Sequence, residues 1–145
     1  MSANFSTIKA GIKAILEADT DLNQTGQVFD YEPPMQSVTK DPFVIVIASD
    51  NEADFGNTIE NKRIYGFKIL IHVERKERGE SAAESLLVDI IDRVINALDQ
   101  NSTLSVSGVL MVKASPSSWA YLVSDKEYRV AEIRVQAMVW FDTTP

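Results

Sequence analysis

The sequence predicts an α+β fold in which two amphipathic helices pack on one face of an antiparallel β-sheet. Two segments repeat apolar residues every three or four positions, and others alternate apolar and polar residues, as amphipathic helices and half-buried strands do. The order helix, strands, helix, strands suits an antiparallel sheet that carries both helices on one face. The 145 residues lie within the usual size range of one domain, so a single domain over residues 1–145 is expected.

The first helix is predicted from Phe5 to about Ala18. Its apolar residues form one stripe at helical spacing: Phe5, Ile8, Ile12, Ile15 and Leu16. Asn4 and Ser6 are the candidate N-caps, and the turn-forming residues 19–21 end the helix.

Two strands are predicted after this helix. Gln27–Tyr31 is a short strand that stops before Pro33 and Pro34, and Phe43–Ile47 is apolar on both faces. A strand that is apolar on both faces is typical of a sheet covered on both sides. Helices would cover one side of Phe43–Ile47, and a neighbouring subunit is a candidate cover for the other.

The acidic, polar stretch 50–61 is predicted to be a long loop. It is interpreted either as a flexible hairpin tip or as a binding loop. It does not match a calcium-binding loop, because that pattern, counted from Asp50, needs glycine where the chain has Phe55 and glutamate where it has Asn61.

The segment Arg63–Glu74 is the clearest strand in the sequence. One face is apolar and consists of Tyr65, Phe67, Ile69, Ile71 and Val73; the other consists mostly of Gly66, Lys68, His72 and Glu74. The charged residues 74–79 then turn the chain. This cluster is interpreted as a mixed-charge turn or as an electrostatic docking point between subunits.

The second helix is predicted from Ser81 to Leu98, and it has the strongest pattern in the chain. Its apolar stripe contains Ala83, Leu86, Leu87, Ile90, Ile91, Val94, Ile95 and Leu98. Ser81 followed three residues later by Glu84 has the form of a capping box.

The last strands are predicted at Val106–Lys113 and Tyr128–Phe141, with an extended piece near 119–123. In the final strand the odd-numbered residues from Ala131 to Phe141 are apolar, whereas Met138 and Trp140 share the other face with polar residues. If the helices cover the odd face, Met138 and Trp140 are exposed in an isolated subunit, and Trp119 and Tyr121 extend this patch. Aromatic residues and methionine are enriched at protein interfaces. The alternative is a local pocket closed by a 114–125 loop.

Composition excludes several kinds of site. The chain has no cysteine and only one histidine, His72, so zinc and thiolate chemistry are disfavoured. His72 is therefore expected to have a structural or surface role. No Gly-x-Ser-x-Gly elbow or glycine-rich phosphate loop occurs. We expect no catalytic residues, no cofactor and no enzyme activity.

The formal net charge of −7 repels phosphate, so direct nucleic-acid binding is not expected. No apolar run approaches the length of a membrane-spanning helix, and the N-terminus lacks the features of a signal peptide. We therefore expect no membrane partner and a cytoplasmic site of assembly.

The order of elements resembles that of the small tail terminator, or tail completion, proteins of long-tailed bacteriophages. The resemblance follows the leading helix, Pro33-Pro34, the apolar strand Phe43–Ile47, the acidic stretch, the capped second helix and the final Val139-Trp140-Phe141. It implies a structural virion protein whose ring, commonly a hexamer, caps the tail tube, ends its polymerisation and offers a surface for head–tail joining.

The implied partners are other copies of the chain, the tail tube protein, and head–tail connector or neck proteins. The implied location is the head-proximal end of the tail in the virion, after assembly in the host cytoplasm. Interface candidates are Asp54, Phe55, Arg75, Lys76, Arg78, Trp119, Tyr121, Arg134, Met138 and Trp140. Two alternatives remain: another neck or head-completion protein, and a small-molecule-binding or enzymatic domain with a pocket beneath Trp119, Tyr121 and His72.

Overall fold

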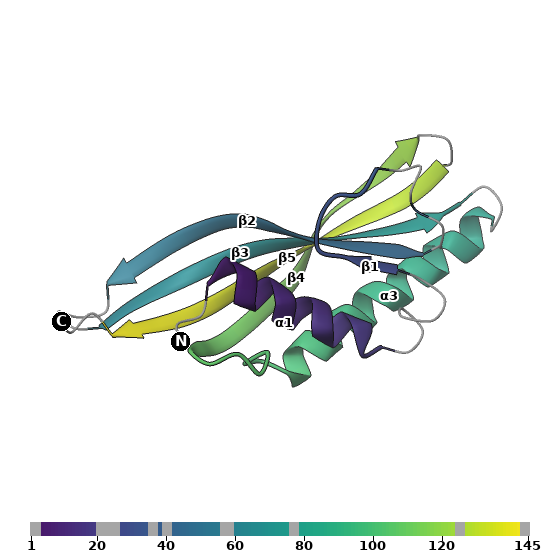
Figure 1. The fold of residues 1–145 in the computed structure, drawn as a ribbon. Coiled ribbons are helices and arrows are strands. Elements are labelled where there is room, and N and C mark those ends of the chain that lie inside the picture. Colours follow the sequence, from purple (N-terminus) through teal and green to yellow (C-terminus); the bar gives the residue numbers. More distant parts are fainter. Residues whose placement is uncertain are drawn as a thin grey trace.

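The computed structural model describes residues 4–19, 27–34, 38, 42–55, 60–75, 79–123 and 127–142, with backbone alone for 50–55, 60–62, 121–123 and 140–142. Within these residues, two helices lie on one face of a five-stranded sheet (Figure 1). The elements are α1 (Phe5–Glu17), β1 (Gln27–Phe29), β2 (Phe43–Phe55), β3 (Glu60–Glu74), α3 (Glu80–Gln100), β4 (Val109–Val123) and β5 (Glu127–Asp142). The predicted α+β class and the placement of both helices on one face are confirmed.

The strand order across the sheet is β1-β2-β3-β5-β4. Neighbouring strands are antiparallel except for β1, which pairs in parallel with the start of β2, Gln27 opposite Phe43. A parallel pair needs a crossover connection, and the chain between Phe29 and Phe43 provides it. The predicted antiparallel sheet is therefore mostly correct, with one short parallel strand at its edge.

Helix α1 begins where the sequence predicts. The Asn4 side chain accepts a hydrogen bond from the Thr7 backbone N–H at 2.9 Å, and the Asn4 N–H donates to the Thr7 hydroxyl at 2.9 Å. This reciprocal pair is a capping box and satisfies helix-end donors. Gly11 allows close packing of α1, because an added Cβ would lie 2.9 Å from Val106 Cγ2 and 3.3 Å from the Leu104 carbonyl oxygen.

Helix α3 has the predicted apolar stripe, but the predicted capping box of Ser81 and Glu84 is wrong. The helix begins one residue earlier, at Glu80, and its N-cap is Gly79, which has φ = 91° and no side-chain cap. A positive φ favours glycine. The Glu84 carboxylate instead accepts a hydrogen bond from Arg129 at 3.1 Å, so a tertiary contact replaces the local one.

The main core lies between the sheet and the two helices. It joins the buried stripes of α1 and α3 to one face of β2, β3, β4 and β5. The predicted apolar faces of β3 and β5 are confirmed as core by Tyr65, Phe67, Ile69, Ile71, Val73, Ala131, Ile133, Val135, Ala137 and Val139.

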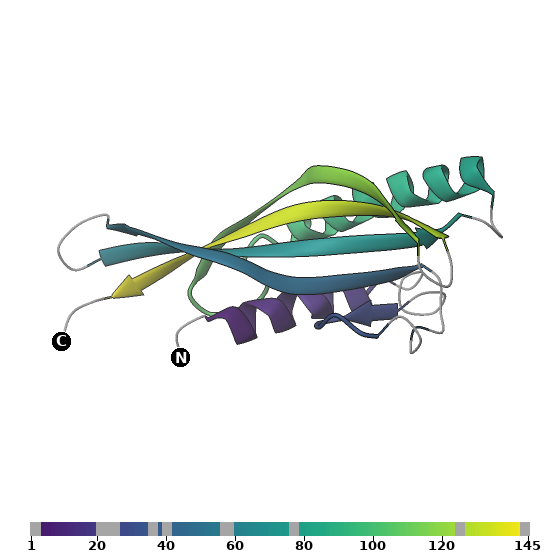
Figure 2. The same cartoon turned by 90° about the horizontal axis from the view of Figure 1, so that it is seen from above.

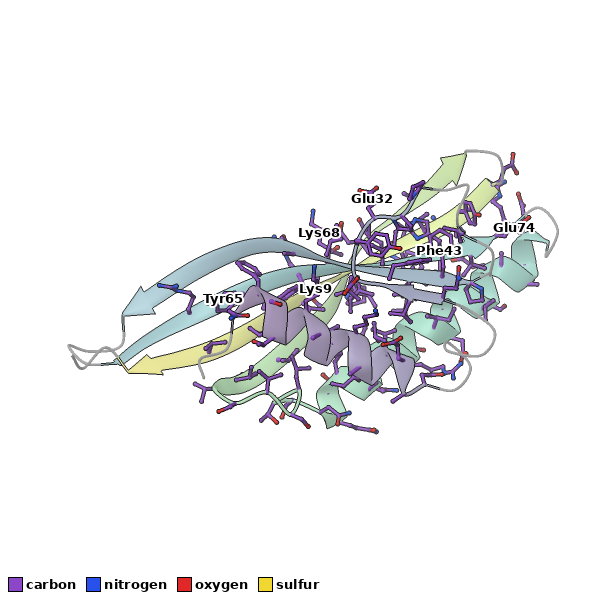
Figure 3. All side chains as sticks on the ribbon, in the orientation of Figure 1. Lys9, Glu32, Phe43, Tyr65, Lys68 and Glu74 are labelled. Carbon is purple, nitrogen blue, oxygen red and sulfur yellow. The ribbon has the colours of Figure 1, made fainter. Side chains whose placement is uncertain are left out.

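A second, smaller core lies on the other face of the sheet. It consists of Phe43, Ile45 and Tyr128, against which Phe29 and Val38 pack. The connection after β1 crosses to this face, as Figures 1 and 3 show. The second apolar side of Phe43–Ile47 is therefore covered at least in part by the same chain, through the β1–β2 connection.

The acidic stretch expected to be a loop is mostly strand. β2 continues to Phe55 and β3 starts at Glu60, and Asn51–Phe55 pair with residues 61–65 after an irregularity at 48–51. Backbone ladder hydrogen bonds form whatever the side chains are, so a polar sequence without alternation hides the strand. The ends of β2, β3 and β5 extend beyond both helices (Figures 1 and 2).

The loop expected over 114–125 is also strand up to residue 123. β4 runs without a break through Pro116, although proline cannot donate to a ladder. It is tolerated because β4 lies at the edge of the sheet. Register shifts at 109–111 and 116–118 interrupt the alternation, which explains why the sequence divides this strand into two pieces.

Candidate assembly interface

The described part of the chain holds no group of three or more histidine, aspartate or glutamate side chains placed to bind a metal ion. None of its helices is long and apolar enough to cross a membrane. Two faces of the layered domain, one on the sheet and one on α3, carry exposed apolar and charged side chains.

The first surface is the sheet face opposite the helices, beyond the second core. Strand registers place Lys68 of β3 beside Arg134 of β5, and Arg134 beside Ser115 of β4. Figure 3 shows Lys68 on this side and Tyr65 on the helix side. We call this surface the uncovered face; its described residues are Ile64, Lys68, Met111, Lys113, Ser115, Glu132, Arg134, Gln136 and Met138.

The centre of the uncovered face is basic. Lys68, Lys113 and Arg134 lie there, and the carboxylate of Glu132 is 3.7 Å from the Lys68 Nζ. Arg134 and Lys113 are exposed. Because the whole chain carries a net charge of −7, this concentration of cations makes the uncovered face electrostatically distinct.

One end of the uncovered face is apolar. Met138 lies opposite Ile64 on β3 and Met111 on β4. Met111 is 49 % exposed, and the neighbouring Leu110 is 44 % exposed. Exposed methionines suit interfaces because their flexible, polarisable side chains adapt to a partner. The sequence points to Met138 but not to Met111, because the irregularity at 109–111 obscures which face that residue occupies.

Trp119 does not extend this patch, contrary to expectation. Its register partner is Ala131, on the helix side of the sheet, whereas Ser115, just before the irregularity, pairs with Arg134 on the uncovered face. The extra residue between Pro116 and Ser118 reverses the direction of the side chains that follow, as a one-residue shift must. Trp119 is 45 % exposed near the start of α3.

Arg129 contacts Trp119, Glu84 and Ala120. Its guanidinium lies 5.4 Å from the Trp119 ring, its Nε donates to Glu84 at 3.1 Å, and its Nη1 donates to the Ala120 carbonyl at 3.0 Å. Arg129 and Glu84 border a pocket of about 320 Å³ that Arg75 and Glu80 also line. Both arginines are paired with carboxylates, so the pocket has no excess positive charge for an anionic ligand.

Arg129→Ala is expected to lower the free energy of unfolding by about 1–2 kcal/mol, because it removes two hydrogen bonds made by a charged group and the contact with Trp119. Glu84→Gln keeps a hydrogen-bond acceptor and should cost less. Urea denaturation followed by circular dichroism measures both. Equal effects of the two variants would show that the Ala120 and Trp119 contacts contribute nothing.

The other interface candidates lie in β2, β4, β5 and the segment before α3. Arg75 donates to Glu80 at 2.7 Å, whereas Lys76 and Arg78 lie outside the described residues. Asp54 and Phe55 are in β2, Tyr121 is in β4 and Trp140 is in β5, but their side chains lie outside the described part. They remain predictions.

His72 has a structural position. It is 5 % exposed, and its ring stacks on Phe43 with 4.3 Å between centroids. Burial lowers its pKa from 6.5 to about 4, against a smaller opposing effect of the Leu70 backbone. His72 points to the second core and Trp119 to the helix side, so the pocket envisaged beneath both residues does not form.

Solved structures of other proteins contain chains with a similar fold. No family model matches the chain, and no curated protein matches its sequence. A chain in the virion of a native gene transfer agent particle has a similar fold, with a TM-score of 0.61, 15 % identity, and coverage of 92 % of this chain and 95 % of that chain.

A chain in the sheath/tube terminator of an extracellular contractile injection system is also similar, with a TM-score of 0.55, 14 % identity and coverage of 100 % of this chain and 61 % of that one. The fold is terminator-like. At such identities the likeness concerns the fold alone. Within the described part of the chain, Met111, Lys113 and Arg134 on the uncovered face are exposed.

Proposed function

We propose that this protein is a structural component of a phage-type tail that forms a ring, caps the tail tube and ends its polymerisation. The observation that carries the proposal is the terminator-like fold, which extends over the whole chain. It is supported by a sheet face whose exposed methionine and cations have no covering layer within the described residues. A domain that acts by contact needs such a surface and no catalytic centre.

In the proposed mechanism, copies of the chain associate into a ring, for which six subunits is the expected number. One surface of the ring binds the last ring of tube protein, and the other presents a surface that tube subunits cannot extend and that a connector or neck protein binds. The protein would lie at the head-proximal end of the tail in the virion, after assembly in the host cytoplasm. It is proposed to be a non-enzyme.

The proposal predicts a change in tube length. Tail tube protein of the same particle, polymerised with increasing amounts of this chain, should form shorter tubes with one capped end in negative-stain images. Met111→Glu, which places a charge in the exposed apolar part of the uncovered face, should reduce capping, whereas Ser6→Glu on the exposed side of α1 should not. Tubes of unchanged length with uncapped ends would refute tube termination.

A second candidate is another neck or head-completion protein. It is favoured by the similarity to a gene transfer agent virion chain, whose description does not fix a position in the particle. In that case the chain should bind purified connector rings and leave tube length unchanged. Co-sedimentation with connectors and with tubes separates the two functions.

A further inference from the structure

The second surface relevant to assembly is the outer face of α3. The residues turned away from the core are exposed: Ser85, Val88, Asp89, Asp92, Asn96 and Asp99. Ser85, Asp92 and Asp99 are seven residues apart, so they lie along one line of the helix. Val88 in this face is 42 % exposed. We call this surface the acidic helix face.

Helix α3 carries more acidic than basic residues. Five exposed carboxylates lie on this helix: Glu80, Glu84, Asp89, Asp92 and Asp99. The first three pair with Arg75, Arg129 and Arg93, so the acidic character of the outer face comes from Asp92 and Asp99. Helix α1 differs because it carries cations. Lys9 donates a hydrogen bond to the Asp30 backbone carbonyl at 3.0 Å, and the Lys13 Nζ lies 4.0 Å from the Asp30 carboxylate. Acidic character is therefore a property of α3 and not of the helical layer as a whole.

The acidic helix face and the uncovered face lie on opposite sides of the domain, because both helices cover the other side of the sheet (Figures 1 and 2). One carries Asp92 one turn from exposed Val88 and Asp99 further along the helix, and the other carries Lys68, Lys113 and Arg134 on the same face as exposed Met111. Opposite charges around apolar groups are complementary, which favours one orientation of approach.

We propose that the uncovered face of one subunit packs on the acidic helix face of a second copy of this chain. This contact rests on the proposed ring function and specifies how neighbours meet. A two-fold contact would instead bring two basic sheet faces or two acidic helix faces together, and like charges would oppose each other. A contact between different faces repeats from subunit to subunit, and it closes into a ring when the rotation allows.

Because the natural chain has no cysteine, two introduced thiols report this contact directly. Ser115→Cys lies on the uncovered face and Ser85→Cys on the acidic helix face, and both serines are exposed. Treated with a short bismaleimide, the double variant should give a ladder of covalent multimers, and each single variant should give monomers. The matched control pairs Ser115→Cys with Ser6→Cys on the exposed side of α1.

Charge reversal tests the same contact by a different route. Lys68→Glu with Arg134→Glu makes both faces acidic, and Asp92→Lys with Asp99→Lys makes the acidic helix face basic. Each double variant should self-associate more weakly than the natural chain by roughly tenfold or more, because like charges then oppose each other. An equimolar mixture should recover association, since each variant offers the face that the other needs. Sedimentation velocity measures the association of the natural chain, of each double variant and of the mixture.

Both tests are run on the full chain, alone at high concentration and bound to tubes. Dimers from Ser115→Cys alone, a ladder no stronger than that of the control pair, or mixtures that fail to recover would overturn the contact. Tubes that are capped without a ladder would reject this contact and leave tube termination intact. A ladder without any effect on tubes would do the reverse.

Discussion

Phe67→Ala is expected to destabilise the fold severely, with a loss of about 3–5 kcal/mol in the free energy of unfolding. Phe67 is fully buried on central strand β3, and the Phe5 ring meets it edge-on at 5.6 Å between centroids. Removing its ring leaves a cavity between the sheet and α1. The total free energy of unfolding of a typical domain is about 5–15 kcal/mol, so the variant should be only marginally stable.

Urea denaturation of Phe67→Ala is compared with two controls. Ile133→Val, at an equally buried position, removes one methyl group and should cost about 0.5–1.5 kcal/mol. Val88→Ala, at a 42 % exposed position, should cost about 0.5 kcal/mol or less. A Phe67→Ala loss no greater than that of Ile133→Val would contradict the position of Phe67 in the main core.

The second large effect is a loss of stability in acid that depends on His72. In the folded protein its pKa is about 4, compared with 6.5 for the free side chain. Well above pH 6.5 the ring is neutral in both states, so its protonation does not change the free energy of unfolding. As the pH falls from 6.5 towards 4, the unfolded chain gains a proton that the folded chain does not, so folding weakens by about 3 kcal/mol in total.

His72→Leu isolates this contribution, because leucine fills the site beside Phe43 and does not titrate. Stability is measured by urea denaturation at several values between pH 4 and pH 7.5, and the slope of the variant is subtracted from that of the natural chain. Carboxylates titrate in both proteins and cancel. Identical slopes would mean that the histidine is solvated and that the second core is open at that point.

The proposed function depends on surfaces that the sequence indicates only in part. Arg134 and Met138 lie on the uncovered face as their alternation with buried residues predicts. The same alternation puts Lys68 on this face, but nothing local marks it as an interface residue, and Asp92 and Asp99 have the pattern of any solvated helix side. Their relevance appears when the two faces are compared as opposite sides of one domain.

Trp119 illustrates a different limit. Its residue type favours an interface, but its side depends on one extra residue in β4. A bulge changes the register without leaving a recognisable pattern in the sequence, and each such shift transfers every later side chain to the other face. The tryptophan consequently belongs with Arg129 and Glu84 at the start of α3.

By itself, the sequence determined the class of fold, both helices, the core faces of β3 and β5, and the absence of cysteine. These depend on local periodicity and composition, which a single segment carries. The tertiary structure alone decided the length of β2 and β4, the parallel β1, the cover over Phe43, the burial of His72 and the side on which Trp119 lies. Those features depend on strand register and on contacts between segments distant in the chain, and no local pattern records them.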